Sequence, residues 1–460
     1  MELTNEVLAV HRQLSNCSAD FLEYVKNNPK GLQREQYNLS RLQYAGATYQ
    51  PWPTFINQHT REQFKNASTN VFKLIRSLPS RLFNNDPEKI SQYFGIPKKE
   101  IKYQLEFANQ ADFNTMLSRG DFVMTDTGVK CLECNICASL GGWEITYLQN
   151  FYANVPFIAE FLQRKRPKIS NTDILIILFT HIIQTIRAKF GDSLDQFNTV
   201  VMMQLSSKWE NRAMQESFLT NPYQRVLAMN NLKGNIAFCK SYELKLSGNT
   251  LYHNNKSVHA VIEMTFGDIS PDMYKAYMAN KLCLFNGPMT TLLSNKFNIS
   301  LLSEHQESDL FTQAERDAIK SSIPWTRKVV PGVTTYNSQE VNLGDFILAN
   351  KDNLVIKPNG ELGGKGVSVG RFTSQADWDA SVKKAMTETQ WLVQEFVGSM
   401  AYMYQNGPSG AALFRLIWGL FVFGDNYGWE WVRLLPVTSD KGVINRAQGA
   451  EEGVVLGVIE

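Results

Sequence analysis

The glycine-rich segment 356–370 restricts the possible folds of this chain more than any other stretch. It reads Ile-Lys-Pro-Asn-Gly-Glu-Leu-Gly-Gly-Lys-Gly-Val-Ser-Val-Gly and places four glycines within ten residues. Backbone of this kind can approach a ligand closely and turn its N–H groups toward an anion. Lys357, at the end of a predicted strand over 353–358, and Lys365 add positive charge. The segment therefore suits a polyphosphate ligand, and a glycine-rich hairpin without a ligand is the alternative.

Two common phosphate-binding motifs do not fit this segment. A Walker A loop needs a glycine six residues before its lysine and Ser or Thr directly after it, whereas Lys365 has Asn359 and Gly366 at those places. A dinucleotide-binding fingerprint opens a helix, whereas a β-branched run follows here and predicts a second strand over 367–372. A polyphosphate site in this chain must therefore be of another type.

A second motif joins two predicted strands, 121–125 and 129–135, by an Asp-Thr-Gly turn at 126–128. Side chains alternate between the two faces of a strand, so Glu133 and Asn135 are expected to point the same way. With Asp121 near them, they supply the hard oxygen ligands that Mg²⁺ prefers. A surface strand with polar outer residues is the alternative.

Three cysteines, Cys131, Cys134 and Cys137, have a spacing found in some zinc and iron–sulfur sites. On a regular strand Cys131 and Cys134 are expected to face opposite sides. No fourth cysteine lies nearby, and no histidine lies between His59 and His181. We therefore interpret these cysteines as packing thiols.

Apolar periodicity predicts further elements along the chain. Helices are expected over 66–78 and over 374–387, where Ser374 is the expected cap. The segment 292–302 is expected to begin an amphipathic helix with Lys296 in its first turn. Strands are expected over 173–179, 391–397, 413–423 and 430–435, and a β-meander over 243–262. A lysine in a first helical turn is usually solvated, so Lys296 alone indicates no site.

Composition excludes several classes of protein. The chain has 460 residues, which predicts about three domains, and Lys+Arg 46 against Asp+Glu 44 leaves a net charge of +2. Such a balance gives no reason to expect a nucleic-acid partner. No basic leader precedes an apolar core, and the longest apolar stretch, 173–184, is too short and interrupted to span a bilayer. Six cysteines do not form a disulfide framework. We expect a cytoplasmic protein with reduced thiols and no membrane partner.

Together these motifs resemble the ATP-grasp superfamily in the circularly permuted form of eukaryotic glutathione synthetase and glutathionylspermidine synthetase. In ordinary ATP-grasp enzymes the lysines and the glycine-rich segment precede the metal-binding strand, whereas here Glu133-Cys-Asn comes first and Lys296 and Lys357 come late. The segment 133–142, Glu-Cys-Asn-Ile-Cys-Ala-Ser-Leu-Gly-Gly, is similar to the metal strand of the permuted branch. The resemblance covers 105–142 and 286–460.

The resemblance implies a role for each matching residue. The implied Mg²⁺ ligands are Asp121, Glu133, Asn135 and Glu361. The implied ATP contacts are Lys296, Lys357, Asn359, a phosphate lid of Gly363, Gly364, Lys365 and Gly366, and a hinge strand of Gln394, Glu395, Phe396 and Val397 whose backbone binds adenine. Arg119, Arg433 and Arg446 would act at the reacting groups, and Ser139 with Arg446 would contact the substrate.

The resemblance also implies the fold, a mixed α+β and α/β architecture with a circularly permuted ATP-grasp core. A mainly helical N-terminal region would cover 1–104, and metal-binding strands of the core would cover 105–150. A mixed α/β substrate domain would cover 151–285. The nucleotide-binding subdomains with the glycine-rich lid would cover 286–460.

The implied activity is that of an ATP- and Mg²⁺-dependent ligase, which joins a small-molecule or peptide carboxylate to an amine through an acyl phosphate and releases ADP and phosphate. A small-molecule kinase on the same fold and a non-catalytic nucleotide-binding module are the alternatives. A homodimer is a further implication. Glutathione itself is not implied, because 261–268 lacks the arginine of glutathione synthetase and Cys137 replaces one of its serines. The acyl donor and the amine acceptor stay open.

Overall fold

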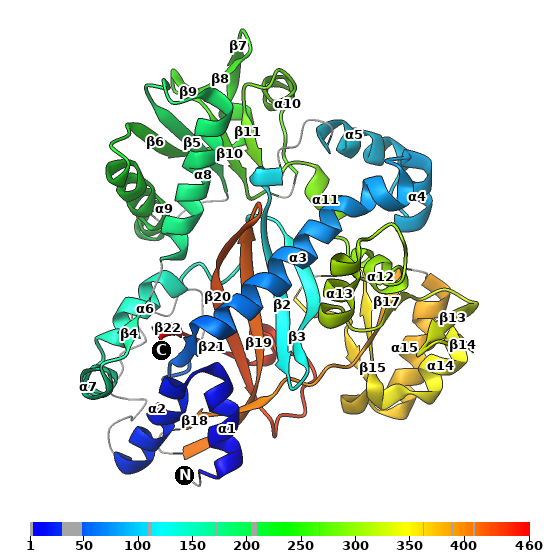
Figure 1. Cartoon of the computed structure of the whole chain (residues 1–460). Coiled ribbons are helices and arrows are strands. Elements are labelled where there is room, and N and C mark those ends of the chain that lie inside the picture. Colours follow the sequence, from blue (N-terminus) through cyan, green and yellow to red (C-terminus); the bar gives the residue numbers. More distant parts are fainter. Residues whose placement is uncertain are drawn as a thin grey trace.

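The chain forms several sheets and many helices in the mixed α+β arrangement that the sequence predicts (Figure 1). This computed structural model describes residues 3–29, 48–108, 113–170, 173–203, 209–265, 267–361, 363–388, 390–407 and 410–460. Those residues form 15 α-helices and 22 strands. In these ranges no helix combines the length and the apolar character needed to cross a membrane. Leu362 of the glycine-rich segment and 30–47 of the N-terminal region lie outside the described residues.

A six-stranded antiparallel sheet forms the centre of the molecule, and the long helix α3 lies across it (Figure 1). The strand order is β21-β20-β19-β2-β3, and β18 pairs with another part of β19. Strands from the first third of the chain therefore complete a sheet with strands from its C-terminal end, and the strands predicted in both regions are confirmed. The bounds are α3 Gln58–Phe83, β2 Leu117–Thr125, β3 Gly128–Ile136, β18 Ala401–Asn406, β19 Gly410–Phe423, β20 Asn426–Pro436 and β21 Glu451–Gly453.

A β-bulge in β3 changes which side chains share a face. The register between β2 and β3 shifts by one residue after Asp121, and Leu132 is the extra residue. Because the bulge reverses the alternation, Cys131 and Cys134 lie on the same buried face, with their Sγ atoms 3.5 Å apart. The prediction that these two cysteines face opposite sides is wrong, whereas their burial agrees with a packing role.

A smaller antiparallel sheet, in the order β12-β17-β15-β16, carries the glycine-rich segment. Helices α14 and α15 pack on it around the buried Trp378, and Ser374 caps α15 as predicted. The predicted strand 367–372 is only two residues long, because the chain turns at Gly370, whose carbonyl accepts from Nζ of Lys351. The bounds are β12 Thr326–Lys328, β13 Val333–Tyr336, β14 Gln339–Asn342, α14 Leu343–Ala349, β15 Leu354–Pro358, β16 Ser368–Val369, α15 Gln375–Glu388 and β17 Trp391–Glu395.

Four parallel strands in the order β11-β10-β5-β6 form a third sheet, at the top of Figure 1. Strands β7, β8 and β9 form a meander beside it, as predicted for 243–262. The last predicted strand of that meander, 257–262, is divided, because 257–258 belong to β9 and 260–262 belong to the buried strand β10 of the parallel sheet. The bounds are β5 Phe197–Met202, α9 Trp209–Met229, β6 Gly234–Phe238, β7 Lys245–Ser247, β8 Thr250–His253, β9 Lys256–Val258, β10 Ala260–Glu263, α10 Pro271–Met278 and β11 Cys283–Phe285.

The run 173–179 forms a helix, so the strand predicted there is wrong. The side chain of Asp173 accepts hydrogen bonds from the backbone N–H groups of Leu175 and Ile176 and begins α8, Ile174–Phe190. Most of the helix surface is buried. A helix that is apolar on nearly all sides shows no stripe of period 3.6, so periodicity alone cannot distinguish it from a buried strand.

The remaining helices surround these sheets, and the small sheet β1-β22-β4 joins three distant parts of the chain. The predicted helix 66–78 lies inside α3, whereas the single helix predicted over 292–302 is two helices. Lys296 lies just before the second of these, α12, which is buried on all sides and is not amphipathic. The bounds are α1 Asn5–Leu14, α2 Asn16–Asn27, β1 Thr54–Asn57, α4 Pro87–Phe94, α5 Lys98–Ala108, α6 Ile145–Ala153, α7 Pro156–Lys165, β4 Lys168–Ile169, α11 Met289–Leu293, α12 Phe297–Glu304, α13 Gln313–Ser322 and β22 Val455–Ile459.

Candidate active site

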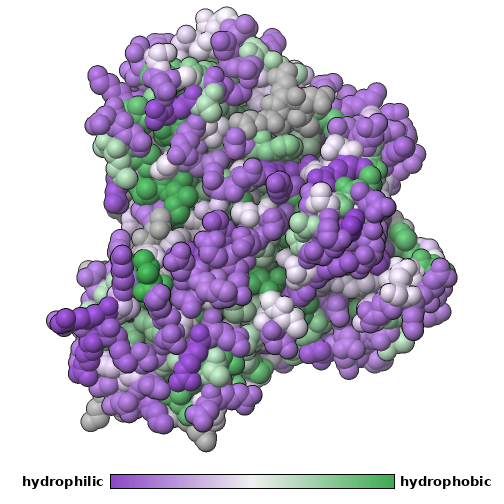
Figure 2. Space-filling model, in the orientation of Figure 1, coloured by the Kyte–Doolittle hydropathy of each residue, from purple (hydrophilic) through white to green (hydrophobic). Residues whose placement is uncertain are grey.

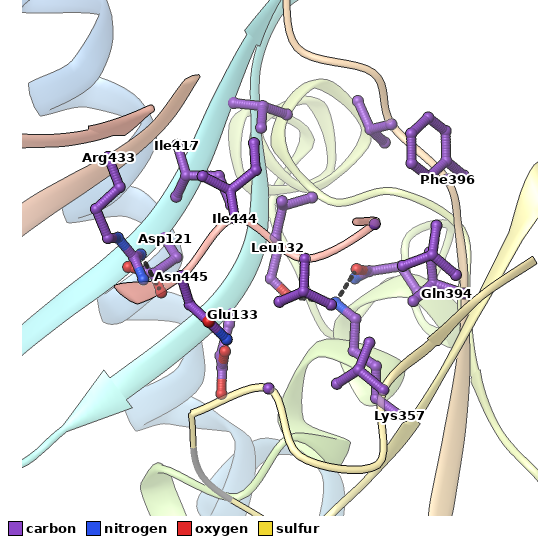
Figure 3. Close-up of a pocket in the computed structure, with 18 of the residues that line it drawn as sticks. Asp121, Leu132, Glu133, Lys357, Gln394, Phe396, Ile417, Arg433, Ile444 and Asn445 are labelled. Carbon is purple, nitrogen blue, oxygen red and sulfur yellow. Dashed lines mark hydrogen bonds and ion pairs between the residues drawn. The ribbon is translucent and has the colours of Figure 1, made fainter. Parts of the chain in front are cut away.

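A cavity of about 200 Å³ lies between the central sheet and the smaller β15–β17 sheet. Figure 3 shows Asp121 and Arg433 at one end and Lys357 with Gln394 at the other. Apolar side chains line another part of its wall, including Leu132, Val355, Val369, Phe396, Ile417 and Ile444. Such a lining suits a ligand that has both an apolar part and a strongly anionic part. We call this space the first cavity.

The first cavity brings together most of the residues that the resemblance implied. Its lining includes Arg119, Asp121, Glu133, Asn135, Lys296, Lys357, Glu361, Gly363, Gly364, Gln394, Glu395, Phe396, Val397 and Arg433. Five implied residues do not line it, namely Ser139, Asn359, Lys365, Gly366 and Arg446. Asn359 instead supports the cavity, since its Oδ1 accepts from the backbone N–H of Lys296 at 3.1 Å. The side chain of Lys365 is exposed.

Asp121 is held between two arginines. Its Oδ1 lies 3.1 Å from Nε of Arg119, and its Oδ2 lies 2.8 Å from Nη2 of Arg433. All three side chains are buried. Burial raises the pKa of Asp121, but the charges and hydrogen bonds of the two arginines outweigh it and hold that pKa below its ordinary value. Nε of Arg433 is buried and has no hydrogen-bond partner among the described residues.

Glu133 and Asn135 face the first cavity from β3, as the alternation predicts. Oε1 of Glu133 lies 3.3 Å from Nζ of Lys296. Within the described ranges, no group of three or more His, Cys, Asp or Glu side chains is arranged to hold a metal ion by itself. Glu133, Asn135 and Glu361 are hard oxygen donors, and such a set suits Mg²⁺ when phosphate oxygens complete its coordination shell. The donor set therefore fits a Mg²⁺–phosphate complex.

Lys357 extends from the end of β15 toward Gln394 (Figure 3). Its Nζ donates to Oε1 of Gln394 at 2.7 Å and to the carbonyl of Leu132 at 3.1 Å. Burial lowers the pKa of Lys357 to about 8, against the opposing charge of Glu133 and with a smaller contribution from Lys296. The bulge at Leu132 thus supplies an acceptor that positions this ammonium group. An anion in the cavity would stabilise its charged form.

The glycine-rich loop is fastened at two points beside the first cavity. Gly363 and Gly364 have φ values of +66° and +74°, which residues with side chains rarely adopt. The carbonyl of Gly363 accepts from Nδ2 of Asn445 at 2.7 Å, and a Cβ at position 364 would lie 2.5 Å from the same Nδ2. On the other side, Nζ of Lys296 donates to the carbonyl of Glu361 at 2.7 Å. These contacts hold the loop against the rest of the site.

The hinge segment 394–397 offers backbone groups at the apolar part of the first cavity. The backbone N–H groups of Glu395 and Phe396 already donate hydrogen bonds, to the carbonyls of Trp325 and Asn353 respectively, each at 2.8 Å. The N–H of Val397 has no such partner among the described residues, so it is the hinge donor that a ligand could use. Gln394 has a second role that the sequence did not indicate, because its side chain positions Lys357.

A second cavity, of about 290 Å³, adjoins the first. Asn445 lines the first cavity and the next residue, Arg446, lines the second. Nη1 of Arg119, in the first cavity, donates to the carbonyl of Gly141 in the wall of the second. Oγ of Ser139 donates at 2.8 Å to the carbonyl of Met264, which also lines the second cavity. Of the two residues implied to contact substrate, Arg446 lines the second cavity, whereas Ser139 does not line it and contacts Met264 of its wall.

Two carboxylates beside the second cavity were not predicted. Oε1 of Glu144 lies 4.0 Å from Nη2 of Arg446, and Oε1 of Glu452 lies 3.3 Å from Nε of the same arginine. Burial raises the pKa of Glu452 to about 7, and the charge of Glu144 adds to this shift while Arg446 opposes it. In the sequence both resemble ordinary surface acids, whereas in the structure Glu452 is buried on β21, which pairs with β20.

No family model and no curated protein matches this chain. Among solved structures it is similar to D-alanyl-alanine synthetase A from Vibrio cholerae O1 biovar eltor str. N16961. The sequence identity is 12%, and the match covers 50% of this chain and 68% of that chain. The TM-score of 0.26 is too low for this likeness to define the fold or the function, so the function has to be inferred from the two cavities themselves.

Proposed function

We propose that the first cavity binds ATP with Mg²⁺ and that the protein is an ATP-dependent carboxylate–amine ligase with a circularly permuted ATP-grasp core. The observation that carries this proposal is the convergence of Lys296, Lys357 and Glu133 on one cavity from three separate parts of the chain. A permutation would explain why β2 and β3, which come early, share a sheet with β19 and β20 from the C-terminal end.

Each part of the first cavity would receive one part of the nucleotide. The apolar wall around Phe396 would hold the adenine ring, and the free N–H of Val397 would donate to it. Lys357, Lys296 and the guanidinium group of Arg433 would contact the phosphates. The glycine-rich loop would cover them.

The proposed reaction has two steps. The γ-phosphoryl group of ATP passes to a carboxylate, and an amine then attacks the acyl phosphate, so that an amide bond forms and phosphate leaves. The first step brings two anions together, and in the second step negative charge develops on the departing phosphate, so the positive charges of Lys296, Lys357 and Arg433 would lower both barriers. Mg²⁺, held by Glu133, Asn135 and Glu361, supplies further charge neutralisation at the phosphate oxygens when bound. Closure of the loop would keep water from the acyl phosphate.

Analysis of the products tests this proposal. Purified protein with ATP and Mg²⁺ is incubated with pools of amino acids, other carboxylates and small amines. ADP and phosphate should form only when a carboxylate and an amine are both present. ADP with a stable phosphorylated product would instead identify a kinase. ATP binding without turnover on any pool would favour a non-catalytic module, and AMP with pyrophosphate would contradict the mechanism.

Nucleotide binding should take up a proton at Lys357. The pKa of Lys357 is about 8 in the free protein, and bound phosphates would raise it, so at pH 8 we expect an uptake approaching about 0.5 proton per nucleotide. Because binding takes up protons, affinity should fall as the pH rises above 8. Calorimetric titration in two buffers of different ionisation enthalpy measures the uptake.

The matched control for this titration is Lys357→Arg, whose guanidinium stays protonated at these pH values. The variant should show no proton uptake from this position. An uptake of the same size in the variant would assign the proton to another group.

A further inference from the structure

The second cavity is almost wholly apolar. Its walls include Leu140, Trp143, Leu178, Phe179, Phe218 and Ile262, and the polar side chains among its described lining are Glu144, Gln215 and Arg446. Its volume of about 290 Å³ exceeds the roughly 150 Å³ of an engineered apolar cavity that binds benzene. Figure 2 shows a hydrophobic patch near α8 and α9 on a largely hydrophilic face. The cavity can therefore hold an aromatic ring or a branched aliphatic chain.

The position of this cavity in the parallel sheet independently indicates a ligand site. Met203 and Met264, which line it, directly follow the carboxyl ends of β5 and β10. The chain leaves β5 for β6 on one side and later returns to β10 on the other side. The gap between β5 and β10 is thus a topological switch point, and open parallel sheets bind ligands outside the carboxyl ends of the strands at such points.

The charged residues at the mouth of the cavity indicate which polar groups a ligand would carry beside its apolar side chain. Arg446 is 41% exposed at the side chain and can pair with a carboxylate. Glu144, whose side chain is 15% exposed, lies next to it and can pair with an ammonium group. Since Asn445 lines the first cavity, a molecule held at Arg446 has its polar groups next to the charged end of that cavity.

We infer that the second cavity binds a hydrophobic α-amino acid, with its aromatic or branched aliphatic side chain among Trp143, Leu178 and Phe218 and its charged groups at Glu144 and Arg446. This inference rests on the proposed function, for which it names one of the two substrates. A hydrophobic amino acid differs from the polar peptide substrates of glutathione-forming enzymes. The difference is expected because mainly apolar side chains line the cavity. Burial of such a side chain should raise affinity by roughly 10- to 150-fold over glycine.

Calorimetric binding of single amino acids tests the inference, with the full chain saturated with MgADP. The probes are L-phenylalanine, L-leucine, glycine and L-glutamate. L-Phenylalanine or L-leucine should bind at least tenfold more tightly than glycine and L-glutamate. Phe218→Asp places a charge in the half-buried wall and should weaken the preferred probe at least tenfold. The matched variant Phe218→Leu should stay within about threefold of the wild type.

Binding of MgADP is measured in the same samples and separates the two hypotheses. Equal MgADP binding in the wild type and both Phe218 variants shows that the variants are folded. The inference is overturned if glycine or L-glutamate binds as tightly as the apolar probes, if neither apolar probe binds, or if Phe218→Asp binds them like the wild type. Failure of the wild type to bind MgADP would contradict the proposed function, and the amino-acid titrations would then be compared without nucleotide.

Discussion

Replacement of Lys357 by methionine should lower ATP-dependent turnover by about 10²–10³-fold, which is the usual effect of removing one well-placed donor to a transition-state oxyanion. The expectation follows from the position of Nζ, which Gln394 and the carbonyl of Leu132 aim into the first cavity. The fold should survive, because the lost hydrogen bonds cost about 1–3 kcal/mol while relief of a desolvated charge offsets part of that loss. Steady-state ADP release and urea unfolding measure the two effects.

Lys365→Met is the matched control for this experiment. Lys365 belongs to the same glycine-rich segment, 356–370, but its side chain is exposed and does not line the first cavity. We expect turnover close to that of the wild type. If Lys365→Met lost as much activity as Lys357→Met, the loop would have to place Lys365 on the phosphates in a conformation other than the one described.

Replacement of Asp121 by asparagine should destabilise the protein by about 3–5 kcal/mol, since it leaves two buried arginines without their common counter-ion. The resemblance implies a Mg²⁺ ligand at this position. In the structure both carboxylate oxygens are engaged by Arg119 and Arg433, so the main effect should be on stability. Urea unfolding at neutral pH measures it.

Glu133→Gln is the comparison variant for Asp121. The Glu133 side chain is 32% exposed and has Lys296 as its ion-pair partner, so its loss should change stability little. The substitution Glu133→Gln should raise the Mg²⁺ concentration that gives half-maximal nucleotide binding. The reverse pattern, with a normal stability for Asp121→Asn and a selective loss of its Mg²⁺ dependence, would make Asp121 the metal ligand and Glu133 the structural group.

Much of the secondary structure around the first cavity could be predicted, because local signals were strong there. The Asp-Thr-Gly turn marked the β2–β3 hairpin, and Ser374 marked the start of α15. Prediction failed where burial removed the periodic signal, as in α8, and where the backbone departed from regular geometry, as at the bulge of Leu132. A bulge has no dependable sequence signature, and here it decides that Cys131 and Cys134 share a face.

The amino-acid sequence by itself determined the residue types of the candidate site, namely the paired lysines, the glycine-rich loop and the Glu-x-Asn strand, because each motif is local. Only the tertiary structure decided how they combine. The antiparallel pairing of β19 with β2 on one side and with β20 on the other brings Asp121 to Arg433, and the hydrogen bond from Asn445 fastens the loop at Gly363. The second cavity could not be predicted, because it is enclosed by side chains from α8, α9, the strands β2, β5 and β10 and the segment before α6, whose packing depends on long-range contacts that no local pattern records.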